Sequence, residues 1–219
     1  SQDTLKKSIE KTISKQNVNA VFIEKETGEP KSKLIDKLYH DLSTNVDCIV
    51  GIGGGSILDT AKYLAMMMVS GGSCTDYEFD DRKIIGALPI YLIPTTSGSG
   101  SEVTPYSVIQ NTESGRKFTI SHPCLFPRAA YIDPQLTLGL PYYQSLSTGL
   151  DASIHNLEVL LNQEGNPLIT PMANVGLEIA FNYLPKLSEN LDNMELRSHL
   201  SLASVMGGYG ISQIRTGLI

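Results

Sequence analysis

A run of glycines between an apolar segment and a helical pattern is the first feature of the chain that could carry chemistry. The apolar segment 47–52 leads directly into the glycines at 53–55, and a helix is predicted to start near Ser56. Glycines let the backbone approach a ligand more closely than any side chain would permit. The N-terminus of the helix adds N–H groups without intrahelical partners and the positive end of a dipole. The turn therefore predicts a binding site for an anion, most simply a phosphate.

The same turn approximates the dinucleotide-binding fingerprint G-x-G-x-x-G without meeting it in full. Gly51 and Gly53 occupy the first two glycine positions, but Ser56 stands where the third glycine belongs. A glycine-rich turn between a strand and a helix also occurs in proteins that bind nothing at that place. The turn alone leaves open whether it binds an anion or nothing.

Two further stretches carry side chains suited to binding. Hydroxyl-bearing residues and glycines gather in Pro94–Val103, which follows an apolar strand pattern. Ligands of open α/β sheets bind at the carboxyl ends of strands, so this segment is a second candidate for ligand contact. Asp151 and His155 are four residues apart and share one face of a predicted helix. Such a pair can chelate a divalent ion, and the alternative is a polar pair that favours the helix dipole.

The composition describes an ordinary globular protein and excludes several classes of function. The chain has 219 residues, a net charge of −6 and 41% hydrophobic residues. A nucleic-acid partner would require a basic face and a membrane surface a basic run, so neither partner is expected. No apolar run approaches the roughly 20 residues that cross a bilayer, and the polar N-terminus lacks the character of a secretory signal. Three widely spaced cysteines indicate neither disulfides nor a zinc site, and we expect a cytoplasmic protein.

Apolar periodicity alternates between strand and helix in the first part of the chain, which predicts βαβ units and a mainly parallel sheet. The predicted elements are helices at 4–14, 31–42 and 57–69, strands at 19–24, 47–52, 84–93 and 129–132, and a β-hairpin of 107–110 and 117–120. From Leu140 onward only helical patterns follow, beginning near Ser147 or Thr148, at 172–187 and at 194–214. We therefore expect an α/β part and then a helical part, with a boundary near residue 140.

Several residues have structural roles in this interpretation. Cys48 is expected to be a small buried hydrophobe in its strand, and Met66–Met68 to pack in the core. Asp59 stands early in its helix, where an acidic side chain is favourable in any case. The remaining histidines are expected at the surface: His40, His122 and His199.

Three segments together are similar to the iron-containing (group III) metal-dependent alcohol dehydrogenase family. They are GGGSILDTAK at 53–62, IPTTSGSGSEVT at 93–104 and IDPQLTLGLPYYQSLSTGLDASIH at 132–155, in the order and at the spacing of the family. The resemblance implies an N-terminal dinucleotide-binding (Rossmann-like) α/β domain of residues 1–140 with a mainly parallel sheet. An all-helical C-terminal domain of residues 141–219 would follow and hold metal and substrate. The resemblance further implies a fragment that lacks the first strand and the later helices of the family.

By position, the resemblance assigns site residues to both domains. The pyrophosphate of NAD or NADP would lie against Gly54, Gly55 and Ser56. Five more residues would line the cofactor cleft: Thr95, Thr96, Thr104, Lys117 and Leu136. Asp151 and His155 would be two of four metal ligands, with Fe2+ the first choice and Zn2+ the second. The other two ligands are histidines in the family and have no counterpart in this sequence, and no general acid or base is assigned.

The resemblance implies an oxidoreductase that transfers a hydride between an alcohol or aldehyde and NAD(P), the metal polarising the substrate oxygen. It also implies a homo-oligomer, such as a dimer, that acts on small molecules. Two alternatives stay open. One is a member of the same fold group similar to glycerol dehydrogenases or dehydroquinate synthases. The segment IPTTSGSGSEVT argues against it, because that segment is more similar to the alcohol dehydrogenases of the group. The other is a catalytically inactive dinucleotide-binding module, which the missing histidines support.

Overall fold

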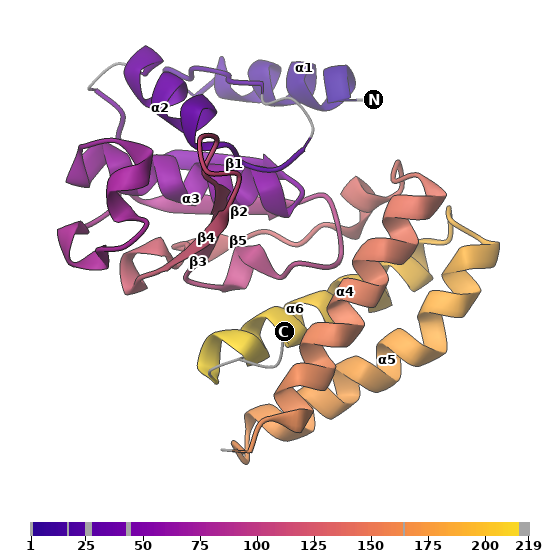
Figure 1. The fold of residues 1–219 in the computed structure, drawn as a ribbon. Coiled ribbons are helices and arrows are strands. Elements are labelled where there is room, and N and C mark those ends of the chain that lie inside the picture. The colour runs from indigo at the N-terminus through magenta and orange to yellow at the C-terminus, as the bar shows by residue number, and fades with distance from the viewer. Residues whose placement is uncertain (1, 17, 25–27, 43–44, 164, 215–219) are drawn as a thin grey trace.

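The computed structural model describes residues 2–16, 18–24, 28–42, 45–163 and 165–214. They form an α/β part and a group of long helices that lies beside it (Figure 1). The helices are α1 (Gln2–Ile13), α2 (Ser32–Asp41), α3 (Gly55–Ser70), α4 (Tyr142–Leu161), α5 (Ile169–Glu189) and α6 (Met194–Gln213). The strands are β1 (Ile49–Gly53), β2 (Ile90–Pro94), β3 (Tyr106–Gln110), β4 (Lys117–Ser121) and β5 (Ala129–Ala130). The predicted fold class, an α/β region with a parallel sheet followed by helices, is confirmed.

A parallel sheet with the strand order β1-β2-β5 carries the α/β part. Ile49 lies opposite Ile90 and Gly53 opposite Pro94, so β1 and β2 end at the same edge. Loops that follow parallel strands meet at that edge, where ligands of open α/β sheets bind. The glycine turn after β1 and the polar segment after β2 are therefore neighbours.

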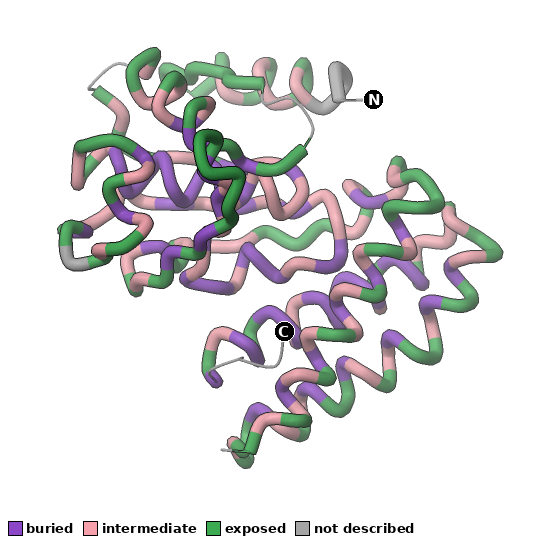
Figure 2. Tube along the Cα trace, in the orientation of Figure 1, coloured by how far each residue is buried: buried purple, intermediate pink, exposed green. Residues whose placement is uncertain are grey.

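Helix α3 is buried on nearly all sides, between the sheet and the hairpin β3–β4 (Figure 1). Leu58, Ala61 and Ala65 pack against Ile90 and Leu92 of β2. A helix that is apolar around most of its circumference is stable only inside a core. Figure 2 shows this burial along α3 and on the facing sides of the helices α4 to α6.

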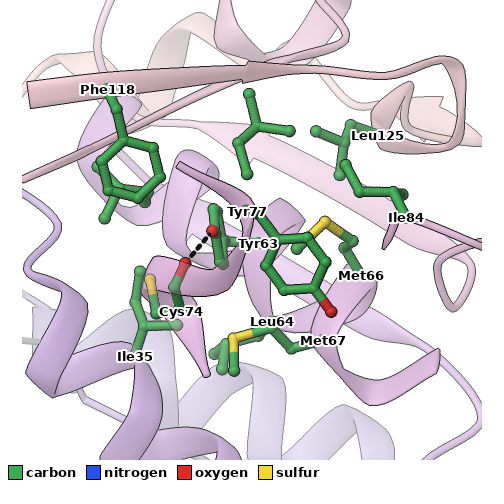
Figure 3. Close-up of a cluster of buried hydrophobic side chains, with 12 residues drawn as sticks. Ile35, Tyr63, Leu64, Met66, Met67, Cys74, Tyr77, Ile84, Phe118 and Leu125 are labelled. Atoms are coloured by element: carbon green, nitrogen blue, oxygen red, sulfur yellow. Dashed lines mark hydrogen bonds between the residues drawn. The ribbon is translucent and has the colours of Figure 1, made fainter. Parts of the chain in front are cut away.

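The opposite face of α3 contributes to the larger hydrophobic cluster (Figure 3). Tyr63, Met66 and Met67 are fully buried there against side chains of α2, the hairpin and the segment after α3. The Tyr63 hydroxyl donates a hydrogen bond of 2.6 Å to the carbonyl oxygen of Cys74, and burial raises the pKa of the Cys74 thiol to about 12. The predicted core position is confirmed for Met66 and Met67, while Met68 is only partly buried.

The predicted β-hairpin is confirmed. Strands β3 and β4 pair in antiparallel fashion, with Ser107 opposite Ile120. Gly115 in the turn has a φ of 72°, a left-handed conformation that glycine adopts without strain. Its N–H donates to the carbonyl oxygen of Asn111 at 2.9 Å and closes the turn. The turn residues thus fix the hairpin locally, as their types predict.

The strand predicted at residues 19–24 is wrong, because the described segment 18–24 forms no strand. Val21 is 75% exposed, and Phe22 and Ile23 are 40% and 41% exposed. An extended segment becomes a strand only where a neighbouring backbone completes its ladder of hydrogen bonds. Among the described residues no strand lies beside the outer edge of β1, so the segment has no partner there.

Strand β1 is covered on one face, whereas its continuous apolar pattern predicts cover on both. Gly51 is buried, and a Cβ placed on it would lie 2.8 Å from the Cβ of Ala61 in α3. Val50, which points the other way, is 52% exposed. Cys48 just before the strand is exposed too, so its predicted burial is wrong. The physical reason is that α3 covers the face of β1 that carries Gly51, while no other described helix packs extensively against this strand.

The largest differences between predicted and observed starts concern β2 and α4. Strand β2 begins at Ile90 rather than at the start of its apolar pattern, because Pro89 has no N–H to donate to a ladder. Helix α4 begins at Tyr142 rather than near Ser147. Tyr142 and Tyr143 are 50% and 85% exposed, so the first turn shows no apolar face from which periodicity could detect it.

Small residues allow the helices α4 and α6 to pack closely. A Cβ on Gly207 would lie 2.8 Å from Nδ2 of Asn156, and one on Gly210 would lie 2.6 Å from Cγ2 of Val159. Fully buried Asn156 also donates from Nδ2 to the carbonyl oxygen of Ala203 at 2.9 Å and ties α4 to α6. Close packing thus explains the glycines inside α6. None of the described helices combines the length and the apolar character needed to cross a membrane.

The α/β part and the helices meet at residues 95–100, the 95–100 loop, which follows β2 and lies against α4 and α6. Gly100 has a φ of 61°, and a Cβ on Gly208 of α6 would lie 2.6 Å from its Cα. A Cβ on Gly98 would lie 2.7 Å from the Cβ of Thr148 in α4. Only glycine fits at these two crossings, so the sequence of the loop is what lets the helices approach the sheet.

Replacing Gly208 by alanine is expected to destabilise the protein by about 1–3 kcal/mol, because the added methyl group meets the backbone of Gly100. Chemical denaturation followed by circular dichroism measures the free energy of unfolding. Gly139→Ala is the matched control: nothing lies within 4 Å of a Cβ there, and the change should stay within about 0.5 kcal/mol. Equal stability of the two variants would contradict the close crossing.

Candidate functional site

A pocket of about 360 Å³ opens at the N-terminus of α3. Its walls are formed by Gly28, Glu29, Pro30, Gly55, Ser56, Asp59, Ser99 and Val108. The N–H groups of Ile57 and Leu58 donate to the carbonyl oxygen of Gly54 at 2.9 and 3.1 Å, so the helical hydrogen bonds begin there. Backbone N–H groups in the first turn of a helix have no acceptor within the helix. The turn predicted to bind a phosphate therefore borders a cavity within the size range of ligand pockets.

The 95–100 loop forms the wall beside the glycine turn. The N–H of Thr95 donates to the last carbonyl of β1 at 2.9 Å and extends the pairing of β1 with β2. A Cβ on Gly54 would lie 3.2 Å from Cγ2 of Thr96, and one on Gly55 would lie 2.7 Å from Oγ of Ser99. The structure thus brings Thr95 and Thr96 to the predicted phosphate turn.

Lys62 of α3 is completely buried beneath the segment that follows the loop. Its Nζ donates to the carbonyl oxygen of Ser101 at 2.9 Å and to that of Tyr106. A carboxylate oxygen of Asp59 lies 3.3 Å from the same nitrogen. Burial lowers the pKa of Lys62, while the negative charges of Asp59 and Glu102 act in the opposite direction. An ammonium group with these partners fixes the chain between the loop and the hairpin.

Asp59 connects the same helix to the hairpin. One carboxylate oxygen accepts a hydrogen bond of 2.6 Å from the Ser101 hydroxyl, and the other accepts one of 3.0 Å from the N–H of Val108. The carbonyl oxygen of Asp59 accepts from the Ser107 hydroxyl at 2.9 Å. Although Asp59 lines the pocket, both of its carboxylate oxygens are engaged, which supports the structural role expected from the sequence.

Thr104, a predicted cofactor residue, lies within this buried network. It is 2% exposed, and both its hydroxyl and its carbonyl oxygen are 3.4 Å from Nζ of Lys62. Its neighbour Glu102 is also 2% exposed, and burial raises the pKa of the Glu102 carboxyl group while Lys62 acts in the other direction. The position of Thr104 supports a role in holding Lys62, and its contact with a cofactor stays a prediction.

Of the other two predicted cofactor residues, Lys117 lies at the rim of the pocket and Leu136 lies away from it. Lys117 begins β4, and its Nζ is 2.8 Å from a carboxylate oxygen of Glu29, which lines the pocket. Leu136 lies in a short 3-10 helix, Pro134–Thr137, which packs against α6. Leu136 is partly buried and is not one of the described residues that line the pocket. The structure therefore brings Lys117 to the pocket but not Leu136.

His155 of α4 faces the 95–100 loop, with Asp151 one helical turn before it. Its Nδ1 is 3.3 Å from the carbonyl oxygen of Gly98, and its Nε2 is 3.8 Å from a carboxylate oxygen of Asp151. Because a carbonyl oxygen only accepts, Nδ1 is the donor in this hydrogen bond, which leaves Nε2 as the ring nitrogen that could bind a metal. Metal-binding histidines use this arrangement, with the second ring nitrogen donating to a carbonyl or carboxylate.

The Asp151–His155 pair fits a divalent ion as two of its ligands. The two facing atoms are 3.8 Å apart, so both can reach one ion at the bond lengths of about 2.0–2.2 Å that nitrogen and oxygen ligands form. Within the part of the chain that the structure describes, no group of three His, Cys, Asp or Glu side chains is placed to hold a metal. Catalytic metal sites use further protein ligands and an open position, so the pair by itself would supply only part of such a site.

Consecutive residues join the two candidate sites. Ser99 lines the pocket at α3, and Gly98 just before it accepts the hydrogen bond from His155. Sequence reasoning selected the loop but not Ser99, and it missed Lys62. The sequence does hold a signal for Lys62: its charge stands in the otherwise apolar middle of a helix, three residues after Asp59. A buried ion pair could have been inferred from that pattern.

Comparison with known proteins finds one family in both parts of the chain. Residues 1–134 match the family described as iron-containing alcohol dehydrogenase, and residues 145–219 match the Fe-containing alcohol dehydrogenase family, C-terminal. The NAD-dependent methanol dehydrogenase of Bacillus methanolicus is 31% identical over 175 residues, which cover 80% of this chain and 46% of that protein.

Solved structures of similar sequence share the fold. An iron-containing alcohol dehydrogenase from Thermotoga maritima superposes with a TM-score of 0.87 at 32% identity, covering 96% of this chain and 57% of that one. The sulfoacetaldehyde reductase from Bifidobacterium kashiwanohense, solved in complex with NAD+, gives a TM-score of 0.83 at 30% identity over 93% and 55% of the two chains. The present chain spans about half the length of the relatives it matches.

Lys62→Met is expected to destabilise the protein by about 3–5 kcal/mol, because it leaves the Asp59 carboxylate without its buried cation. It also removes the donor to the carbonyl oxygens of Ser101 and Tyr106. Urea denaturation measures the loss. As a control, Asp59→Asn combined with Lys62→Met should cost less than the sum of the two single changes, because both charges then disappear. Strictly additive losses would contradict the pairing.

Proposed function

The chain belongs to the iron-containing alcohol dehydrogenase family. We therefore propose that it forms part of an oxidoreductase that transfers a hydride between an alcohol or aldehyde and NAD(P). One observation carries this proposal: the 95–100 loop borders the pocket through Ser99 and holds His155 through Gly98. Hydride transfer requires the nicotinamide and the reacting carbon to be side by side. The 95–100 loop would meet that requirement, because it borders both the proposed nucleotide pocket and the proposed metal ligands Asp151 and His155.

The nucleotide part of the proposal rests on the start of α3. The diphosphate of NAD(P) would lie against the backbone of Gly54, Gly55 and Ser56, where N–H groups and the helix dipole favour negative charge. Thr95 and Thr96 would face the same ligand from the loop. The missing side chain of Gly55 lets the Ser99 side chain lie directly against the turn, since a Cβ at position 55 would be 2.7 Å from Oγ of Ser99. This contact supports the assignment because it brings a hydroxyl group to the proposed phosphate site.

The metal part of the proposal rests on Asp151 and His155. They would hold a divalent ion as two of its ligands, with Fe2+ ahead of Zn2+. Such an ion supplies Lewis-acid polarisation of the substrate oxygen, and NAD(P) supplies the hydride chemistry. His155 contributes orientation, because its hydrogen bond to Gly98 directs the Nε2 lone pair toward Asp151. Asp151 contributes a negative charge that stabilises a bound cation.

A second candidate is a dinucleotide-binding module without catalysis. Its support is the donor set, since only two candidate ligands meet at the Asp151–His155 pair among the described side chains. A homo-oligomeric state, a cytoplasmic location, the boundary near residue 140 and the cofactor contact of Leu136 stay predictions of the sequence.

Purified protein is expected to bind NADH or NADPH saturably, and Gly54→Val should weaken that binding by about tenfold or more. A Cβ at position 54 would already lie 3.2 Å from Cγ2 of Thr96, so the larger valine side chain is expected to push Thr96 and the loop away from the phosphate turn. Nucleotide fluorescence follows the titration. Gly139→Val is the control, because a Cβ at that exposed site meets nothing within 4 Å. Parental affinity in Gly54→Val, or no saturable signal from the parent protein, would contradict the nucleotide site.

Asp151→Ala is expected to lower the affinity for a divalent ion by about tenfold or more, because it removes one of the two candidate ligands. Calorimetric titration with Zn2+, and with Fe2+ under anaerobic conditions, measures the affinity. Glu178→Ala, which removes an exposed carboxylate from α5, is the control. If the parent protein and Asp151→Ala bind the ion equally, the metal assignment fails and the second candidate gains.

A further inference from the structure

We propose that Cys124 is a modification site that forms a mixed disulfide with a low-molecular-weight disulfide carrying carboxylate groups. The site is a second pocket, of about 330 Å³, which Cys124 lines together with Arg128. Residues 88–90 of its wall lead into β2, so this pocket lies where the strand begins. The pocket at α3 opens where the strands end, and the two pockets share no described wall residue. The thiol pocket is thus separate from the proposed nucleotide site.

His122 and Cys124 form a pair in which the thiol is the donor. Nδ1 of His122 accepts a hydrogen bond of 3.2 Å from the backbone N–H of Cys124, so this ring nitrogen carries no proton. The Sγ atom of Cys124 lies 2.9 Å from the same nitrogen, which makes the S–H group the donor. A base in hydrogen-bond contact with a thiol is the arrangement that activates a sulfur nucleophile.

The base matters because of where the thiol lies. Burial raises the pKa of the Cys124 thiol, so without a base the thiol would keep its proton at neutral pH. Transfer of the proton to Nδ1 of His122 gives a thiolate beside an imidazolium, and each charge stabilises the other. The other two cysteines lack this combination, since Cys74 is fully buried and Cys48 is exposed but is not a described wall residue of this pocket.

Arg128 gives the pocket a preference for negative charge. Its backbone N–H donates to the carbonyl oxygen of Ile90 at 2.7 Å, which fixes the residue beside β2. Arg128 is exposed, and no described side chain forms an ion pair with it. A guanidinium group binds a carboxylate through two parallel hydrogen bonds. Pro89 and Phe126 add apolar walls, which suit the carbon chain between a carboxylate and a disulfide.

The exchange balances without a further oxidant. The S–H bond of Cys124 breaks as its proton moves to Nδ1 of His122, and the thiolate attacks one sulfur of the disulfide. A new S–S bond forms while the old one breaks, and the departing thiolate takes the proton from His122. The Cys124 sulfur is oxidised, and the departing sulfur is reduced to a thiol. An added thiol reverses the reaction by the same steps.

The test uses two probes: glutathione disulfide, which carries carboxylates, and the uncharged bis(hydroxyethyl) disulfide. Mass spectrometry of peptides from the treated protein measures the rate at each cysteine. With both probes Cys124 is expected to react about tenfold or more faster than Cys48, because it has a base in contact. A rate at Cys48 equal to or above that at Cys124 would overturn the proposal, since exposure alone would then decide the reaction.

Two substitutions separate the base from the anion site. His122→Asn keeps a side-chain acceptor for the N–H of Cys124 but removes the base, and it should slow Cys124 by about tenfold with both probes. Arg128→Gln should slow Cys124 by about fivefold with glutathione disulfide only. Arg116→Gln is the matched control, because it removes the same charge from an exposed residue that does not line the described pocket. It should change neither rate.

The variants test the two parts of the site in turn. An unchanged rate in folded His122→Asn would overturn the role of the base. Slowing of both probes alike by Arg128→Gln, or of neither, would overturn the assignment of a carboxylate-bearing partner. Circular dichroism melts check that each variant is folded, and the rate at Cys48 in the same sample is the internal reference. The comparison of Cys124 with Cys48 in the parent protein needs no variant.

Discussion

The buried ammonium group of Lys62 is the interaction on which the arrangement of the site depends. It gathers carbonyl oxygens from both ends of the segment 101–106 and a carboxylate from its own helix. Removal of a charge from water is costly, and here the cost is met by hydrogen bonds that no neutral side chain of that length could make. The same helix that presents its N-terminus to the pocket therefore also fixes the path of the chain that follows the 95–100 loop. The glycine turn and the loop are therefore positioned by one helix.

Small side chains are the second constraint. The 95–100 loop lies between α3 on one side and α4 and α6 on the other, and it has room there because Gly98 and Gly100 carry no Cβ. Ser99, between them, turns its side chain toward Gly55 and the pocket. Alternation of glycine with serine thus gives the loop a polar side chain at the pocket and backbone without side chains against the helices. A loop of larger residues would hold the helices away from the sheet and separate His155 from Gly98.

The sequence predicts what depends on neighbours along the chain and misses what depends on neighbours in space. The hairpin turn at Gly115 follows from local conformational preference, and the start of α3 after Gly54 follows from the change in apolar pattern, so the places of both agree with the structure. The segment 19–24 has the pattern of a strand, but pairing requires a partner that no local pattern reveals. Lys62 escapes notice for the same reason, because its carbonyl partners lie about forty residues further on. Thr104 shows that a residue in a segment predicted to bind a cofactor can still face the interior.

The crossing of Gly100 with Gly208 has a mechanical consequence. Two backbones this close have no side chains between them that could compress or reorient, so α6 cannot slide along the sheet edge without breaking the contact. Rotation of α6 about the crossing would keep the contact intact, so the crossing would act as a pivot. Points near a pivot move least, and Ser99 is adjacent to it along the chain. Any rocking of the helices therefore changes distant gaps most and leaves the wall shared by pocket and histidine nearly still.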